Sequence, residues 1–277
     1  MKALITAAGK NHRHLPLQTI TNAEGQPVSI LRMQLLELRA AGIEKTGIVI
    51  NPGDEALLQD AAGDLADFID CLPQQGGQGY GHAIFCARDF VGDEAFLLSI
   101  ADHLFVSDLP QRNCFQQVME SAGQMQASVS AVQPTRESQI HAFGVIAGER
   151  VDRIPGVLRI SEVIEKPTPT LAEQDLIVSG LRAGQYLAFF GIHVLQPSIF
   201  ALLEQLLAAS AVPARVTLTD AVNQLLNEED YYAIEVAGRR FDLEAPFGLL
   251  HGQVALALKS PAREQIMADL LQLVAER

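Results

Sequence analysis

Short apolar runs alternate with helical patterns along the first half of the chain. Each run is too short for an independent helix, so the runs predict buried strands. Between the first two runs, residues 30–41 carry apolar side chains at positions 31, 35 and 38, and Gly42 follows as a helix stop signal. A second helix is expected from residue 81 to residue 87. The strands predicted in this half are residues 2–5, 46–50, 96–100 and 127–132.

The second half of the chain continues this alternation. Residues 261–277 are interpreted as an amphipathic terminal helix, and Thr219 is predicted to cap a helix over residues 219–226. Residues 149–159 and 167–184 are the least regular and are interpreted as loops. The remaining predicted elements are strands at 143–146, 163–165, 187–194 and 233–236 and a helix at 198–207.

Strands that alternate with helices define the expected fold class. They predict an α/β fold in which a Rossmann-like, mostly parallel (mixed) sheet is sandwiched by helices. No internal repeat or low-complexity linker divides the chain. We therefore expect a single domain over residues 1–277.

Composition narrows the classes of partner and compartment. Hydrophobic residues make up 48% of the chain, which suffices for a packed core, and 33 acidic against 20 basic side chains give a formal net charge of −13. This negative field repels phosphate backbones, so nucleic acids and anionic membranes are not expected as partners. The sequence has no apolar run of transmembrane length and no signal-peptide pattern, and its three cysteines lack a C-x-x-C spacing. We therefore expect a cytoplasmic protein.

The first candidate for chemistry is the loop that follows the first predicted strand, residues 7–16. Its small residues, Ala8 and Gly9 among them, allow backbone amides to approach phosphate groups, and Arg13 adds a fork of donors. The loop matches neither the dinucleotide-binding fingerprint nor the P-loop. The alternative is an ordinary turn with solvated basic residues.

The second candidate is the glycine-rich segment over residues 74–83. It contains four glycines within six residues, including Gly81, and it leads into a helical pattern. Glycines permit close backbone approach to a flat ligand such as a nucleobase, and the amide of Gln74 can pair with the polar edge of a base. A flexible connection is the alternative.

Two aspartates are candidates for binding a cation. Asp102 follows the predicted strand at 96–100, and ligands of open α/β sheets bind beyond the carboxyl ends of the strands. A carboxylate there suits a magnesium ion that bridges phosphate oxygens. Asp242 is a candidate second metal carboxylate in a turn-rich segment. In both cases the alternative is an aspartate that caps a turn.

An adjacent acid and base end another predicted strand. Glu165 can accept hydrogen bonds from sugar hydroxyls, and Lys166 can hold a phosphate. The alternative is an exposed pair of charges linked to each other.

The order of these segments carries more information than any one of them. The chain presents a glycine loop with Arg and Leu-Pro, then Q-x4-G-x-G-H-A, a strand-end aspartate, E-K-P, L-T-D-A and D-x-x-x-P-x-G. In this order the chain resembles the sugar-1-phosphate nucleotidyltransferases over nearly its whole length. The segments at 74–83, 142–145, 218–221 and 238–242 most resemble the bacterial UTP–glucose-1-phosphate uridylyltransferases.

The resemblance implies a fold, a reaction and a set of site residues. The fold would be that of the nucleotide-diphospho-sugar transferases. The reaction would be Mg²⁺-dependent transfer of a nucleotidyl group from UTP, or a related triphosphate, to a sugar 1-phosphate such as glucose 1-phosphate. Family members often form dimers or tetramers, so a homo-oligomer is an open alternative. The implied residues are Ala8, Gly9, Gln74 and Gly81 for the nucleotide, Asp102 and Asp242 for Mg²⁺, Gly144 and Glu165 for the sugar, Lys166 for its phosphate and Arg13 for the pyrophosphate.

The chain departs from the family pattern in the nucleotide loop. The family's G-x-G-T-R is replaced by a sequence that lacks the second glycine and the threonine, and residues 17–28 contain no lysine where the family has K-x-x-L-P. Lys10 could substitute for that cation. Glu244 stands where the family has a glycine, Tyr186 where it has an asparagine and Arg215 where it has an acid. The alternative function is therefore a catalytically degenerate regulatory protein that binds a nucleotide or nucleotide sugar.

Overall fold

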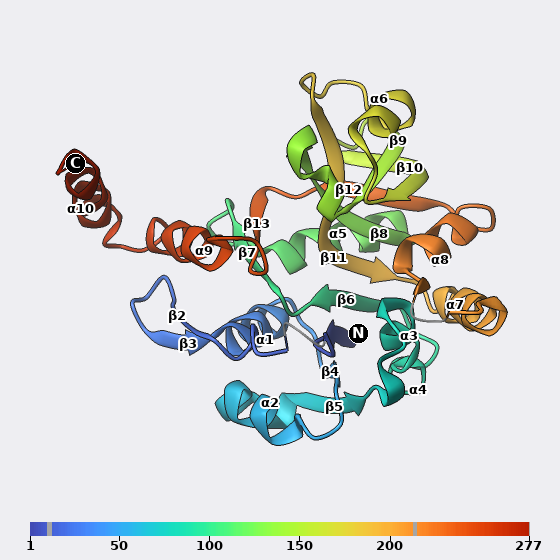
Figure 1. Cartoon of the computed structure of the whole chain (residues 1–277), viewed down its shortest axis with the longest axis horizontal. Coiled ribbons are helices and arrows are strands. Elements are labelled where there is room, and N and C mark those ends of the chain that lie inside the picture. The colour runs from blue at the N-terminus through green and yellow to red at the C-terminus, as the bar shows by residue number, and fades with distance from the viewer. Residues whose placement is uncertain (10–12, 213–214, 277) are drawn as a thin grey trace.

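A mixed β-sheet forms the centre of the molecule (Figure 1). The computed structural model describes residues 1–9, 13–212 and 215–276. Within these residues, the nine strands of the sheet lie in the order β5 (Ile69–Pro73), β4 (Thr46–Ile50), β1 (Ala3–Thr6), β6 (Phe96–Ile100), β11 (Gln185–Leu195), β8 (Ser128–Arg136), β12 (Tyr231–Glu235), β10 (Val157–Glu165) and β9 (Gly144–Arg150).

The sheet is parallel in its first part and mostly antiparallel in its second. β1 pairs in parallel with β4 and β6, and β5 continues this arrangement beside β4. Each of these strands is joined to the next by a helical crossover, which parallel strands require. β11 then runs antiparallel between β6 and β8. The predicted α/β fold with a mixed sheet is confirmed, and the prediction that the strands are mostly parallel holds for the first part.

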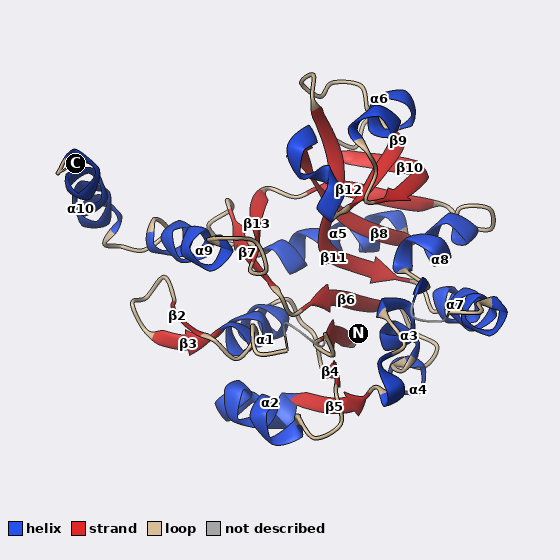
Figure 2. Cartoon of the chain, in the orientation of Figure 1, coloured by secondary structure: helices blue, strands red, loops and turns tan. Residues whose placement is uncertain are grey.

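Helices cover both faces of the sheet (Figure 2). Successive side chains of a strand point to opposite faces, so Leu4 packs in one hydrophobic core and its neighbours Ala3 and Ile5 pack in the other. Helices α3, α4, α7 and α8 contribute to the first core, and α1, α2 and α5 contribute to the second. The helices are α1 (Ile30–Ala40), α2 (Glu55–Ala62), α3 (Tyr80–Phe85), α4 (Arg88–Val91), α5 (Cys114–Met125), α6 (Pro169–Asp175), α7 (Ser198–Ala209), α8 (Leu218–Leu225), α9 (Gly248–Ala257) and α10 (Arg263–Ala275), with short 3-10 turns η1 (Gly63–Phe68), η2 (Gln75–Gly77) and η3 (Glu137–Ala142).

Two small antiparallel ribbons lie beside the main sheet. One pairs β2 (Thr19–Thr21) with β3 (Pro27–Ser29), and the other pairs β7 (His103–Ser107) with β13 (Gly238–Asp242). The sequence patterns did not predict β7 as a separate strand. The β7–β13 ribbon matters for the site because Asp102 directly precedes β7 and Asp242 ends β13.

The strands predicted at 46–50 and 96–100 are confirmed with the same bounds, whereas several helix ends differ. Thr219 is not the cap of α8. Thr217 caps this helix, because its side chain accepts a hydrogen bond from the amide of Asp220 and the Asp220 carboxylate accepts one from the amide of Thr217. This reciprocal capping box satisfies two amides at once, and Thr219 lies inside the helix.

The segments interpreted as loops are partly ordered into regular structure. Residues 149–159 include the end of β9 and the start of β10, which pair as an antiparallel hairpin. Residues 167–184 contain α6, which Thr168 caps through its side chain. The interpretation of these two segments as loops was therefore wrong in part. Their hydrophobic periodicity is weak, but hairpin pairing orders residues of the first segment and a capped helix orders residues of the second.

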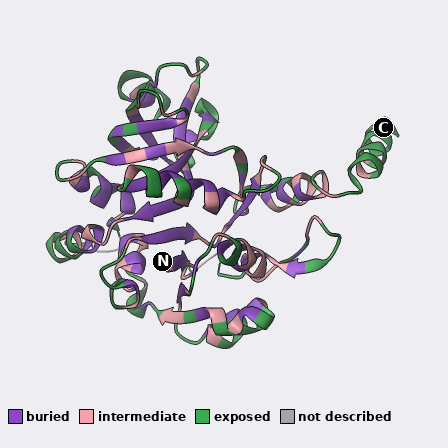
Figure 3. Cartoon of the chain, turned by 180° about the vertical axis from the view of Figure 1, so that it is seen from behind, coloured by how far each residue is buried: buried purple, intermediate pink, exposed green. Residues whose placement is uncertain are grey.

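The C-terminal residues extend away from the rest of the chain as an arm (Figures 1 and 3). The predicted terminal helix is present as α10, but none of its residues is buried, and its apolar side chains Met267, Leu271 and Val274 are exposed. Its amphipathic pattern therefore has no partner surface within the described part of this chain. Within that part, no helix is long and apolar enough to span a membrane.

A bulge in β11 brings the backbone close to β6. The register between β11 and β8 shifts between Phe189 and His193, and Gly191 in this interval has a φ of +94°. A Cβ atom at Gly191 would lie 2.7 Å from the side chain of Ile100. Glycine is required here both for its left-handed backbone and for the close approach.

We predict that Gly191→Ala lowers the free energy of unfolding by ~2–4 kcal/mol, because it combines left-handed strain with overpacking. Chemical denaturation measures this difference. Gly123→Ala is the matched control: Gly123 is an exposed residue inside α5, and a Cβ atom there would have no other atom within 4 Å, so alanine should stabilise by ~0.5–1 kcal/mol. Equal stability of the Gly191→Ala and parent proteins would contradict the interpretation.

Candidate nucleotide and sugar-phosphate site

A cavity of about 380 Å³ lies at the carboxyl ends of three parallel strands. The residues after β1, β5 and β6 meet there, because parallel strands end at the same edge of a sheet. The structure thereby brings together four residues that the sequence singled out from three separate segments. The cavity is lined by Thr6, Ala8, Gly9, Gln74, Gly79, Tyr80, Ala83, Ile100 and Asp102.

Gln74 is fixed in one orientation by its neighbours. Its side-chain amide donates to the carbonyl oxygen of Gly79 at 2.9 Å and lies 3.1 Å from Nδ1 of His82. Burial lowers the pKa of His82, which favours a neutral ring whose Nδ1 accepts this hydrogen bond. Since the amide nitrogen is occupied, the amide oxygen of Gln74 remains as the acceptor for a ligand.

Asp102 lies on a turn that is anchored from two sides. The Nδ1 atom of His103 donates to Asp102 Oδ1 at 2.8 Å, and the side-chain amide of Gln34 on α1 donates to the carbonyl oxygens of Ile100 and His103. Burial acts to raise the pKa of Asp102, but the hydrogen bond and charge of His103 outweigh it, and the pKa lies below its ordinary range. The Asp102 side chain keeps 31% of its surface exposed, so an ionised carboxylate faces the cavity.

Asp242 lies next to Asp102 across the β7–β13 ribbon. It pairs with His103 in the ribbon, and the amide of Leu243 donates to the carbonyl oxygen of Asp102 at 2.9 Å. The amide of Glu244 donates to Asp242 Oδ1 at 2.9 Å, which orients the second carboxylate. Asp242 lines a neighbouring cavity of about 420 Å³ rather than the first one.

Gly248 explains one glycine of the sequence motif around Asp242. A Cβ atom at this position would lie 1.8 Å from the carbonyl oxygen of Asp242. The start of α9 therefore contacts the backbone of Asp242 so closely that only glycine fits.

The two aspartates fit a magnesium ion that would take its other ligands from substrate phosphates and water. The described residues contain no group of three or more histidines, cysteines or carboxylates that could hold a metal alone. Mg²⁺ is, however, commonly bound by one or two carboxylates together with substrate phosphates and water. Asp102 and Asp242 supply such a donor set from adjacent ends of one ribbon.

The predicted sugar residues come together at the ends of β9 and β10. Gly144 pairs with Glu165 in the antiparallel ladder, and a Cβ atom at Gly144 would lie 3.2 Å from Oε2 of Glu165 and 2.8 Å from the ring of Phe189. The hydroxyl of Thr219 donates to the same Glu165 oxygen at 2.7 Å. Thr219, proposed from the sequence as a cap, instead orients this carboxylate.

Lys166 has an unusual backbone conformation. Its φ is +51°, and its amide donates to the carbonyl oxygen of Phe143 at 3.0 Å. Left-handed backbone at a residue other than glycine is uncommon and is concentrated at functional sites. The conformation ends β10 and leaves the Lys166 side chain exposed beside Glu165.

Gly81, predicted to bind the nucleotide, and Arg13, predicted to face the pyrophosphate, both lie outside the cavity lining. The amide of Gly81 donates to the carbonyl oxygen of Val216, and a Cβ atom there would lie 2.7 Å from that oxygen, so Gly81 permits close packing of α3. Arg13 is exposed, and its guanidinium forms an ion pair with Asp54 at 3.3 Å. Lys10, the candidate substitute cation, lies outside the described residues.

Sequence reasoning missed residues that complete the cavity. Tyr80 and Thr6 line it. Burial and the charges of Asp102 and Glu165 raise the pKa of Tyr80 above its ordinary range, so the phenol stays protonated as a donor. Asn51 donates to the carbonyl oxygen of Ala8 at 3.2 Å and holds the loop that follows β1. The sequence could have indicated Thr6 and Asn51 by their positions, because Thr6 ends β1 and Asn51 directly follows β4.

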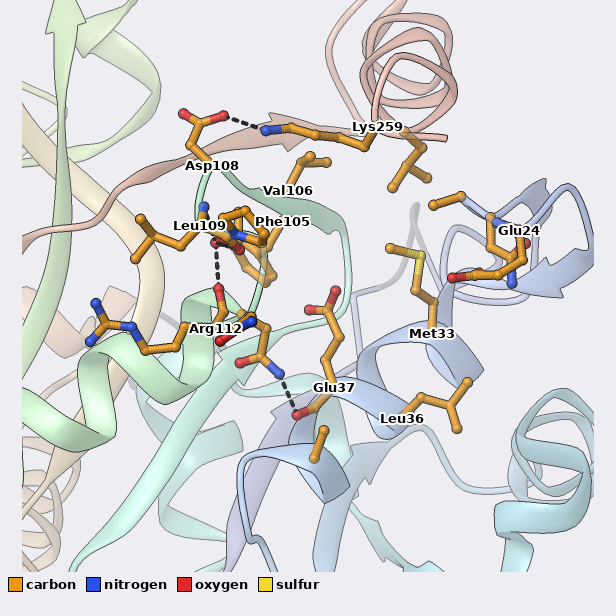
Figure 4. A pocket seen from close by; sticks show the side chains of 18 of the residues that line it. Glu24, Met33, Leu36, Glu37, Phe105, Val106, Asp108, Leu109, Arg112 and Lys259 are labelled. Carbon is orange, nitrogen blue, oxygen red and sulfur yellow. Dashed lines mark hydrogen bonds and ion pairs between the residues drawn. The ribbon is translucent and has the colours of Figure 1, made fainter. Parts of the chain in front are cut away.

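A larger cavity, of about 700 Å³, lies elsewhere, between α1, the segment after β7 and the end of α9 (Figure 4). It contains none of the predicted site residues. Lys259 and Asp108 form an ion pair at 2.8 Å on one side of it. The Glu37 side chain points into the cavity, and burial raises its pKa from 4.5 to about 8.

Comparison with known proteins places this chain in a family. A family model described as "Nucleotidyl transferase" matches residues 2–240. The chain is 28% identical to the UTP–glucose-1-phosphate uridylyltransferase of Streptococcus pneumoniae, over 98% of this chain and 95% of the relative. It is 29% identical to the enzyme of that name from Staphylococcus epidermidis, over 95% of this chain and 94% of the relative.

Solved structures agree with the fold. A UDP-glucose pyrophosphorylase complexed with UDP-glucose matches with a TM-score of 0.73 and 23% identity, covering 92% of this chain and 97% of the other. A UTP-bound UGPase from Acinetobacter baumannii matches with a TM-score of 0.70 and 20% identity, over 99% and 98%. The chain belongs to the nucleotidyl transferase family, with the α/β fold of that family.

We predict that Glu37→Gln stabilises the protein increasingly as the pH rises. Because the folded state raises the pKa of Glu37 from 4.5 to about 8, folding keeps a proton that the unfolded chain has lost between these values. Stability is therefore lost as pH rises through this window, by no more than a few kcal/mol above pH 8, because Glu37 is half-buried and water in the cavity screens its charge. Chemical denaturation at pH 4.5, 6 and 8.5 measures the free energy of unfolding of both proteins. The advantage of Glu37→Gln over the parent should be near zero at pH 4.5 and should grow at the two higher pH values. A difference independent of pH would contradict this.

Proposed function

We propose that this protein is a Mg²⁺-dependent enzyme that transfers a uridylyl group from UTP to a sugar 1-phosphate, glucose 1-phosphate in the first instance. The products are UDP-glucose and pyrophosphate. The observation that carries the proposal is the convergence of Ala8, Gly9, Gln74 and Asp102 in one cavity at the carboxyl ends of parallel strands. The uridylyltransferase names of the curated relatives support the choice of substrates.

The base is recognised by Gln74 in this proposal. Uracil presents an imide N–H between two carbonyl groups, and the Gln74 amide oxygen is the acceptor that its neighbours leave for a ligand. The cavity of about 380 Å³ falls in the size range of small-molecule sites. The loop with Ala8 and Gly9 then passes alongside the phosphates.

The reaction exchanges one phosphoanhydride bond for another. An oxygen of the sugar phosphate attacks the α-phosphorus of UTP in line, the bond from that phosphorus to the β-phosphate oxygen breaks, and pyrophosphate leaves with its electron pair. No covalent enzyme group is needed, so the chain contributes positioning and charge stabilisation. Lys166 holds the attacking phosphate, and Gly144 and Glu165 bind the sugar.

Asp102 and Asp242 are the residues that would hold Mg²⁺. When bound, the ion would neutralise charge on the phosphate oxygens during transfer. His103 and the Glu244 amide keep the two carboxylates oriented for this role. Arg13 is assigned to the departing pyrophosphate.

The lysine-free loop favours a second candidate, a protein that binds UTP or UDP-glucose without turnover. Residues 17–28 lack a lysine, and the nearby cation Arg13 is paired with Asp54. Loss of one preorganised cation would reduce the rate by roughly 10²–10³-fold. A slow enzyme and a binding protein therefore differ only in measured turnover.

We expect the wild-type protein to release pyrophosphate from UTP, glucose 1-phosphate and Mg²⁺, and Asp102→Asn to reduce kcat by at least ~10²-fold, because one fixed charge at the reacting phosphates is lost. Asp108→Asn is the matched control, since Asp108 lies in the larger cavity and should leave kcat within about twofold.

If the wild-type protein binds UTP with micromolar affinity but releases no pyrophosphate with any of a panel of triphosphates and sugar phosphates, the binding function replaces the proposed enzyme activity. Full activity of Asp102→Asn would overturn the assignment of the site.

A second prediction concerns the base. Gln74→Leu should raise the KM for UTP by ~10-fold or more while leaving kcat within about twofold, because it removes binding that ground and transition states share. Steady-state kinetics with varied UTP measure this, and Gln78→Leu, at an exposed neighbouring position, is the control. An unchanged KM would exclude Gln74 from base recognition.

A further inference from the structure

Arg240 is a buried charge in the β7–β13 ribbon. It belongs to the motif at 238–242, and only 7% of its surface is exposed. Among the described residues, no carboxylate lies close enough to form an ion pair with it. An arginine guanidinium stays protonated in proteins, so this side chain is charged at neutral pH. Burying a cation costs free energy unless hydrogen bonds compensate for the lost water, so the groups that contact Arg240 indicate why it is buried.

The guanidinium donates to backbone oxygens at the β11 bulge. Its acceptors are the carbonyl oxygens of Ala188, at 3.4 Å, and of Phe189, and it also reaches the Thr135 hydroxyl at 3.4 Å. The register of β11 breaks directly after Phe189, and Arg240 contacts the strand at that point. One side chain of the ribbon is thus fixed to both β8 and β11.

The guanidinium also stacks on the ring of Phe143, with the central carbon 3.6 Å from the ring centroid. The His103 ring meets the same phenyl ring edge-on, at 6.4 Å between centroids. The carbonyl oxygen of Phe143 accepts the amide hydrogen of Lys166, and Phe143 directly precedes Gly144. Phe143 therefore connects Arg240 to both sides of the site.

These contacts bridge two parts of the site that come from different sheets. Asp102 and Asp242 lie at the end of the ribbon, whereas Gly144, Glu165 and Lys166 lie on the antiparallel part of the main sheet. Arg240 lies two residues before Asp242 on the same strand, so both side chains leave the same side of β13.

We propose that Arg240 is a positioning residue that fixes the two metal carboxylates relative to the lysine and glycine that hold the sugar phosphate. This inference rests on the function proposed above. A displacement of about 1 Å between reacting groups can reduce a rate ~10²-fold, so loss of the guanidinium fork should act mainly on kcat. Gln74 and the nucleotide loop lie on the parallel part of the sheet, and nucleotide binding should be spared.

The test compares Arg240→Lys, which keeps the charge but loses the planar fork, with Arg239→Lys at the exposed neighbouring position. Kinetics with varied Mg²⁺ and glucose 1-phosphate give kcat, KM and the Mg²⁺ half-saturation. Calorimetric titration gives UTP affinity without Mg²⁺ and UDP-glucose affinity with and without it.

For Arg240→Lys we expect kcat to fall ~10–10²-fold, the Mg²⁺ half-saturation to rise and the Mg²⁺-dependent gain in UDP-glucose affinity to shrink. UTP affinity without Mg²⁺ should stay within twofold, and Arg239→Lys should match the parent.

Phe143→Leu is the second variant, because it removes the stacking ring and keeps the arginine. It should shift the same quantities in the same direction, which keeps the inference testable if Arg240→Lys does not fold. Folded variants with parental kcat, Mg²⁺ half-saturation and metal-dependent affinity would overturn it, as would an equal loss of UTP and UDP-glucose affinity. A wild-type protein that neither turns over nor binds UDP-glucose would instead overturn the proposed function itself.

Discussion

The site depends on one constraint of sheet geometry: parallel strands end at the same edge. Inside the sheet, backbone amides and carbonyls are paired with neighbouring strands, so backbone groups that are free to contact a ligand are found just beyond the last paired residues. β1, β5 and β6 place Ala8, Gln74 and Asp102 at such positions, although these residues are far apart in the sequence. The remaining parts of the fold bring Gly144, Glu165 and Asp242, the other predicted site residues, together.

The antiparallel part and the ribbon supply what the parallel strands cannot. Glu165 is held by Thr219 from α8, and the ribbon carries Asp242 back to the turn at Asp102. Glu165, Thr219 and Asp242 all lie outside the parallel strands β1, β4, β5 and β6 and outside the crossovers that join them. The candidate site therefore lies at a junction between two modes of strand pairing.

The sequence predicted those features that local patterns encode. The buried strands at 46–50 and 96–100 appear with their predicted bounds, because a continuous apolar run between polar segments has few other solutions. The order of motifs pointed to residues that the structure does gather, such as Gln74 and Asp102. Contacts such as those of Arg240 with Phe143 and Phe189 join residues far apart in the chain, so the hydrophobic periodicity of a local segment cannot predict them. Thr217 caps α8 in place of the predicted Thr219, whose hydroxyl instead donates to Glu165, a contact across the chain that the local sequence does not encode.

The placement of β11 has a consequence for how the protein is made on the ribosome. β6 ends at Ile100, but its partner on that side, β11, begins only at Gln185. At a synthesis rate of ~5–20 residues per second, the hydrogen-bonding edge of β6 stays without its final partner for on the order of 10 s. Throughout that interval the nascent parallel half presents an apolar strand edge of the kind that chaperones cover and that aggregating chains share. Slowing translation between these two strands would lengthen that exposure without changing the finished fold.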